Sequence, residues 1–206
     1  MVKGSSKNNW LARQQKDPYV KQAQQSHYRS RAVYKLIEID ERDHLFKQGQ
    51  IVIDLGAAPG SWSQYVGEKI GSKGRLIAID ILPMEPINNT LLIEGDFTEQ
   101  LVYDECLQAM NNAKADLVIS DMAPNLSGVR AADQASSLTL AELSLDLAKS
   151  VLKAGGDMLV KVFEGEGMDK YRHDLNEHFG KIVVRKPKAS RDDSREFYVL
   201  AKTFRL

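Results

Sequence analysis

The 206-residue chain has little cysteine, no net charge and no long hydrophobic run, and each absence excludes a class of protein. Its only cysteine, Cys106, can form no internal disulfide, which fits a reducing compartment. A structural zinc site built from several thiolates is excluded for the same reason. No apolar run approaches the ~20 residues of a membrane span, and the polar N-terminus lacks the apolar core of a signal peptide. We therefore expect a cytoplasmic protein with no metal site and no membrane partner.

The length and the 43% hydrophobic content are enough to bury one sizeable core, so one domain is expected. We predict that this domain spans residues 17–206 and opens with a helical extension. The basic segment 1–16 is expected to be loosely ordered. Nothing in the sequence determines the oligomeric state, and a monomer is the simplest expectation.

The zero net charge conceals an uneven distribution along the chain. The first 36 residues hold eight Lys or Arg and one acidic residue, and residues 181–206 hold eight Lys or Arg and three acidic residues. Two basic ends on an acidic body are typical of proteins that contact the phosphate backbone of a nucleic acid. Solvated basic tails would have the same composition, so charge alone does not decide between the two.

Short apolar segments alternate with helix-length segments along most of the chain. Such alternation predicts a mostly parallel sheet with helices on both faces. The last two strands are joined by only about nine residues, too few for a parallel crossover, so the last strand should be antiparallel. The seven predicted strands are 50–55, 75–80, 90–95, 115–121, 157–163, 181–186 and 196–201, and the predicted helices lie near 61–70, 98–112, 133–153 and 168–179.

Ahead of the sheet, residues 17–46 read as one or two helices. Ser30 is the expected N-cap of the second helix. Arg31 and Lys35 are four residues apart and would share one face of it.

The predicted strands end in glycines and acids, and ligands of open α/β sheets bind at these carboxyl ends. In the turn DLGAAPGSW (54–62), Gly56 and Gly60 allow the backbone to approach a ligand closely. This turn matches neither the dinucleotide-binding nor the P-loop pattern. Asp80 is placed to accept ribose hydroxyls, and Asp96 is placed to accept an exocyclic amine. Each feature alone also fits a tight turn or a helix cap, but their coincidence favours a nucleoside ligand.

A lysine, Lys161, interrupts the apolar fifth strand, and burying a lysine is costly unless it is paired or used. We expect the fourth and fifth strands to neighbour the first, so that Asp121 faces Lys161. The reversed last strand would bring Glu196 to the same edge, and the leading helix would bring Lys35. The alternative is a buried ion pair without a catalytic role.

The motifs SRAVYKL, DLGAAPGSWSQ, SDMAPN, LVKVFEGEG and KPKASRDDSREFYVLA, taken together and in this order, resemble the FtsJ/RrmJ family of S-adenosylmethionine-dependent RNA 2′-O-methyltransferases. The similarity runs from about residue 17 to residue 201. It implies a Rossmann-like methyltransferase fold and methylation of a uridine ribose in 23S rRNA of the large ribosomal subunit. Ser61 departs from the pattern, since close relatives often have a second glycine there.

The resemblance also implies site residues. The catalytic set would be Lys35, Asp121, Lys161 and Glu196, with Lys161 as the base or as the group that orients the 2′-hydroxyl; its protonation state stays open. The S-adenosylmethionine contacts would be Gly56, Gly60, Trp62, Asp80, Asp96 and Asp121. RNA contacts are expected at Arg29, Arg31, Lys186, Lys188, Arg191 and Arg195. Stacking of bases on Trp10, Tyr19 or Tyr28 is a further option, although aromatic residues at helical spacing often belong to a core.

Other functions share parts of this pattern. A nicotinamide oxidoreductase would need a glycine pattern that is missing. Methylation of an exocyclic amine usually goes with an Asn/Asp-Pro-Pro-aromatic turn after the fourth strand, where this chain has DMAP. A tRNA methyltransferase of the same family would keep the four charged residues. The chain could also be a non-catalytic ribosome-assembly factor that binds the cofactor, and a methyl-transfer assay would distinguish this from an enzyme.

Overall fold

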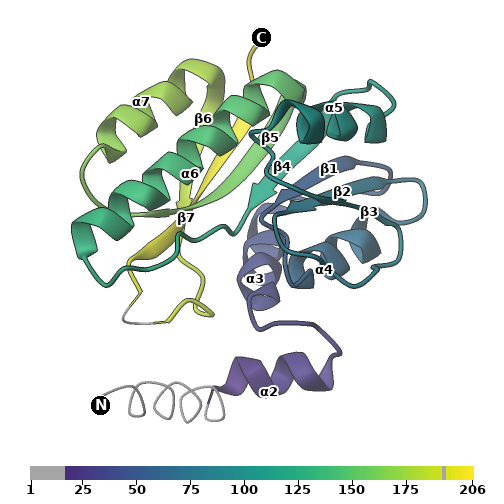
Figure 1. The fold of residues 1–206 in the computed structure, drawn as a ribbon, viewed down its shortest axis with the longest axis horizontal. Coiled ribbons are helices and arrows are strands. Elements are labelled where there is room, and N and C mark those ends of the chain that lie inside the picture. The colour runs from purple at the N-terminus through teal and green to yellow at the C-terminus, as the bar shows by residue number, and fades with distance from the viewer. Residues whose placement is uncertain (1–16, 192–193) are drawn as a thin grey trace.

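A computed structural model describes residues 17–191 and 194–206, which fold around one seven-stranded sheet (Figure 1). The strand order is β3-β2-β1-β4-β5-β7-β6, and β7 is antiparallel to both of its neighbours. The Rossmann-like methyltransferase fold and the reversed last strand are thus as predicted. The strands are β1 Ile51–Leu55, β2 Arg75–Asp80, β3 Thr90–Glu94, β4 Ala115–Ser120, β5 Leu152–Phe163, β6 Phe179–Arg185 and β7 Glu196–Phe204.

Helices cover both faces of the sheet. Figure 1 shows α5, α6 and α7 over one face and α3 and α4 over the other, with α2 beyond the layered body. None of the helices in the described ranges is long and apolar enough to cross a membrane. The helices are α2 Pro18–Gln25, α3 Val33–Asp43, α4 Ser61–Ile70, α5 Gln100–Ala109, α6 Arg130–Val151 and α7 Met168–His178.

The sheet separates two hydrophobic cores. Successive residues of a strand point to opposite faces, so Val52 joins the core under α3 and α4, whereas Ile53 joins the core under α5, α6 and α7. Because both faces are covered, the central strands are mostly apolar. Lys161 is the buried charged residue of β5. It is 7% exposed and follows Leu159 on the α3–α4 face.

Three local expectations were wrong. Ser30 does not cap α3, because the helix begins at Val33 and its N-cap residue, Ala32, makes no side-chain cap hydrogen bond. The helix predicted over 133–153 is too long at its C-terminus, because α6 ends at Val151. The next residue, Leu152, already begins β5, which has a register shift against β4. The fifth strand borders the fourth and not the first. Residues 1–16 and Trp10 lie outside the described ranges, so the predictions for them stay predictions.

Candidate active site

Four charged side chains meet at the carboxyl ends of β4 and β5. Lys161 Nζ lies 3.0 Å from Asp121 Oδ1 and donates a hydrogen bond to the main-chain oxygen of Asp121 at 2.6 Å. Lys35 Nζ, from α3, lies 2.6 Å from Glu196 Oε1 and 3.9 Å from Asp121 Oδ1. The four side chains are between 6% and 18% exposed. The structure therefore brings together all four residues of the predicted catalytic set.

The register of β5 and β7 explains why these groups converge. Lys161 pairs with Tyr198, and Phe163 pairs with Glu196. Since β7 alternates its side chains between the two faces, Glu196 and Tyr198 point to the same side as Lys161. Asp121 directly follows β4, whose register against β5 brings it beside the lysine.

Tyr198 belongs to this cluster and was missed from the sequence. Its hydroxyl donates to Asp121 Oδ1 at 2.5 Å, and its ring centre lies 5.8 Å from that of Trp62. Burial, followed by the charges of Asp121 and Glu196, raises the pKa of Tyr198 well above its ordinary value, so it stays a hydrogen-bond donor. The sequence indicated Tyr198 only by its position two residues after Glu196, which places both side chains on the same face of a strand.

Asp121 remains ionised although it is buried. Burial pushes its pKa up, but the ammonium groups of Lys161 and Lys35 and the Tyr198 hydroxyl together hold the pKa below the ordinary value. A carboxylate with this set of donors is fixed in position between the two lysines. It can therefore orient Lys161 as well as counter its charge.

The glycine turn after β1 requires glycine at both predicted positions. A Cβ on Gly56 would lie 2.1 Å from Met122 Cγ, and one on Gly60 would lie 2.5 Å from Ile87 Cδ1. Both residues also have positive φ, of 67° and 101°. Gly60 begins α4 without a side-chain cap, so the first N–H groups of this helix suit an anionic group such as an amino-acid carboxylate.

The acids after β2 and β3 are held in place by backbone amides. Asp80 accepts hydrogen bonds from Ala58 N and Leu82 N, each at 2.8 Å. Asp96 accepts from the amide and the hydroxyl of Thr98. Each carboxylate keeps lone pairs for ribose or adenine donors, so this edge fits a nucleoside that carries an amino acid. The hydrogen bonds from Thr98 to Asp96 also have the pattern of an Asx turn, so Asp96 fits a purely structural role in this turn as well.

Comparison with known proteins identifies the family. A family model described as FtsJ-like methyltransferase matches residues 28–204. The chain belongs to this family. The ribosomal RNA large subunit methyltransferase E of Marinobacter nauticus is 54% identical over 206 residues, which is 100% of both chains. The protein of the same name from Pseudomonas aeruginosa is 54% identical over 205 residues, covering 100% of this chain and 99% of that one.

A solved structure agrees with this assignment. A Plasmodium falciparum protein described as a ribosomal RNA methyltransferase superposes with a TM-score of 0.76 at 31% identity. The match covers 86% of this chain and 98% of that chain.

Trp62 lies in the FtsJ-like domain with its side chain buried between α4 and the segment before α3. Its indole N–H donates to the Ala32 carbonyl at 2.8 Å, and the residue is 3% exposed. The ring thus joins α4 to the segment before α3. The buried ring therefore offers little surface to a cofactor.

Two of the basic residues predicted to contact RNA are engaged within the FtsJ-like domain. Arg29 donates to the carbonyls of Pro59, Glu85 and Pro86 at 2.9 to 3.0 Å. It thereby holds the glycine turn against the segment after β2. Arg31 pairs with Asp17 and also donates to a main-chain carbonyl in the segment before β7. We therefore leave both guanidinium groups out of the proposed RNA surface.

Asp54 is a second residue of the FtsJ-like site that was missed. It lies near the carboxyl end of β1, is 1% exposed, and accepts a hydrogen bond from Ser63 Oγ at 2.7 Å. Burial raises its pKa to about 7, the Ser63 hydrogen bond opposes this, and the charges of Asp121 and Asp80 add to it. The signal in the sequence was an acid two residues before Gly56, inside an otherwise apolar strand.

The pH dependence of stability should change in an Asp54→Asn variant. The folded protein holds a proton on Asp54 up to a pKa of about 7, whereas the unfolded chain releases it near 4. Between these values the folded state binds more protons, so wild-type stability falls as pH rises. We expect wild type to lose about 2 kcal/mol relative to D54N between pH 5 and pH 7. Urea unfolding over this range is the measurement, and parallel stability curves would contradict the assignment.

Proposed function

We propose that this FtsJ-like methyltransferase transfers a methyl group from S-adenosylmethionine to the 2′-hydroxyl of a uridine in 23S rRNA of the large ribosomal subunit. The observation that carries the proposal is the buried Lys161–Asp121 pair, 3.0 Å apart, at the edge of the sheet that also holds the glycine turn. The full-length relatives named ribosomal RNA large subunit methyltransferase E support the choice of RNA.

S-adenosylmethionine, when bound, supplies an already activated methyl group. What the protein must add is alignment of a weakly acidic hydroxyl and a group to take or share its proton. Lys161 Nζ is that group in our proposal, because Asp121 holds it from two sides with its carboxylate and its main-chain oxygen. A neutral Lys161 amine would accept the proton of the 2′-hydroxyl, whereas a Lys161 ammonium would orient this hydroxyl.

Lys35 and Glu196 would hold the ribose and the neighbouring phosphate. Their ion pair of 2.6 Å borders Asp121, and Lys35 also lies 5.8 Å from the centre of the Tyr198 ring. This arrangement keeps the two side chains extended toward the ligand edge. The ribose would therefore meet one acceptor and one cation beside Lys161.

The cofactor would be held by Gly56, Gly60, Asp80, Asp96 and Asp121, with the amide of Trp62. The RNA surface would use the exposed groups of Lys186, Lys188, Arg191 and Arg195. A monomeric, cytoplasmic enzyme without DNA, membrane or metal partners remains our prediction, as does a single domain over 17–206.

The experiment that tests the function is transfer of labelled methyl from S-adenosylmethionine to unmodified large subunits, free 23S rRNA and tRNA in parallel. We expect label in large-subunit RNA. Label in tRNA alone would overturn the substrate. An enzyme that binds the cofactor but labels none of the three RNAs would overturn the activity and favour an assembly factor.

A further inference from the structure

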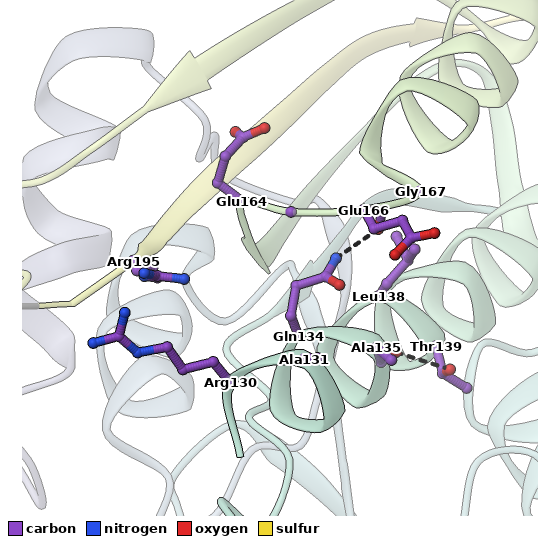
Figure 2. A pocket seen from close by; sticks show the side chains of 11 residues that line it. Arg130, Ala131, Gln134, Ala135, Leu138, Thr139, Glu164, Glu166, Gly167 and Arg195 are labelled. Atoms are coloured by element: carbon purple, nitrogen blue, oxygen red, sulfur yellow. Dashed lines mark hydrogen bonds between the residues drawn. The ribbon is translucent and has the colours of Figure 1, made fainter. Parts of the chain in front are cut away.

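A pocket of about 590 Å³ lies beside the catalytic set, between the start of α6, the loop after β5 and the residue before β7 (Figure 2). Its volume is within the range that small-molecule sites occupy in proteins. Of its lining residues, only Arg195 has a role in the proposed function, as a member of the RNA surface. The pocket is lined by Arg130, Ala131, Gln134, Ala135, Leu138, Thr139, Glu164, Gly165, Glu166, Gly167 and Arg195.

Two guanidinium groups give this pocket its chemical character. Figure 2 shows Arg130 and Arg195 on the same side of it. Among the described residues, no carboxylate lies within ion-pair distance of either one. Of the two acids in the lining, Glu164 is paired with Arg172 at 2.8 Å, and Figure 2 shows the Glu166 carboxylate on the side of the pocket opposite the two arginines. Two arginines that pair with no carboxylate in the described part of the chain suit an oxyanion with several acceptor oxygens, of which a phosphate is the common case.

The floor and wall of the pocket depend on two glycines of the EGEG segment. A Cβ on Gly165 would lie 2.5 Å from Gln134 Cγ, and one on Gly167 would lie 2.5 Å from Leu138 Cδ2. Gly167 also has a positive φ of 86°. The Gln134 amide then donates to the Glu166 carbonyl at 2.7 Å and ties the loop to α6. The loop therefore packs directly on the helix, and the apolar faces of Ala131 and Ala135 remain open above it.

The pocket lies at the same edge of the sheet as the proposed site of methyl transfer. Arg195 directly precedes Glu196, and Phe163, which pairs with Glu196, directly precedes Glu164. Lys161 and Glu164, the first residue after β5, are three residues apart, which is about 10 Å of extended chain. A ligand in the pocket would thus lie at about this distance from a ribose bound at Lys161.

The geometry points to a subsite for the nucleotide next to the methylated one, with its phosphate between Arg130 and Arg195. The sugar and base of this nucleotide lie over the apolar face of α6 formed by Ala131, Ala135 and Leu138. This inference rests on the proposed function, because it assumes that RNA enters at Lys161. It adds Arg130 to the RNA contacts, a residue that the basic ends of the chain did not indicate.

The test is an Arg130→Gln variant, with Arg42→Gln as its matched control. Arg42 is an exposed arginine in the last turn of α3, away from the pocket lining. Loss of one phosphate contact should weaken binding of a short RNA around the mapped nucleotide about fivefold to tenfold at 0.1 M salt. It should also reduce the slope of log affinity against log salt by about 0.7 to 0.9. Cofactor affinity should not change in either variant.

RNAs with a neutral methylphosphonate at one position locate the contact. For wild type, one neutralised phosphate beside the target should reproduce the loss seen in R130Q. The variant itself should lose nothing further with that RNA. If every methylphosphonate weakens wild type and R130Q by equal factors, Arg130 contacts no phosphate and the inference is wrong.

A steric variant tests the pocket without removing charge. Ala135→Trp should fill it and weaken RNA binding by a similar factor, while Ala113→Trp, at another exposed alanine, should not. Unchanged RNA binding by A135W and R130Q, in an enzyme that still methylates RNA, overturns the subsite alone. A wild-type protein that binds cofactor but methylates no RNA overturns the proposed function as well.

Discussion

Replacement of Lys161 by methionine should lower the rate of the methyl-transfer step by about 10²- to 10⁴-fold and leave cofactor affinity unchanged. Lys161 Nζ is held at 2.6 Å from the Asp121 main-chain oxygen and 3.0 Å from its carboxylate. Methionine keeps much of the apolar stem but removes the group that takes or orients the hydroxyl proton. Single-turnover transfer at saturating RNA gives the rate, and calorimetric titration gives cofactor affinity.

The matched control is Lys181→Met, which removes an exposed strand lysine on β6. It should transfer methyl groups at the wild-type rate. If K161M also kept near-normal turnover, Lys161 would be a buried ion-pair residue without a catalytic role. Loss of cofactor binding in K161M would likewise contradict the assignment, because it would place the effect on the cofactor and not on the hydroxyl.

Asp121→Asn should be the most destabilising conservative change in the site, by about 3 kcal/mol at neutral pH. Asp121 is the carboxylate between Lys161 and Lys35, and the Tyr198 hydroxyl also donates to it. Its removal leaves two largely buried cations with one remaining carboxylate, Glu196. The same change should slow methyl transfer, since it releases Lys161. Urea unfolding measures the stability, and single-turnover transfer measures the rate.

The pH dependence distinguishes this loss from a packing defect. The folded-state pKa of Asp121 is lowered, so its contribution is present at neutral pH and declines as pH falls through the folded pKa. The stability curves of wild type and D121N should therefore converge below about pH 4, where the unfolded carboxyl titrates. A difference that stays constant on acidification would mean that the charge of Asp121 contributes nothing. Asp43→Asn, which breaks the pair with Arg185 elsewhere, is a control for rate and should leave methyl transfer unchanged.

The sheet could be predicted because burial on both faces decides which residues its strands contain. Strands such as β1 and β4 are buried on both faces, so they form mostly apolar runs that stand out from the helices. The convergence of Lys35, Asp121, Lys161 and Glu196 followed from strand ends and one reversed strand. None of this needed side-chain detail.

What could not be predicted depends on contacts between distant segments. Arg29 carries the same charge as an RNA-binding arginine, but three carbonyls of two loops engage it. Asp54 differs from its neighbours as an acid inside an apolar strand, but its burial and its hydrogen bond from Ser63 depend on the folded chain. Tyr198 gives no signal beyond its alternation with Glu196. The end of α6 was misplaced because residues 152 and 153 continue a helical pattern that pairing with β4 overrides.

The central claim is that the Lys161 site methylates a ribose hydroxyl, and the most direct test is the chemical identity of the product. Unmodified large-subunit RNA is incubated with the enzyme and cofactor, digested to nucleosides and analysed by mass spectrometry, with K161M in parallel. We predict 2′-O-methyluridine in the wild-type sample and only traces in the K161M sample. A base-methylated nucleoside, or equal 2′-O-methyluridine from both proteins, would contradict the account.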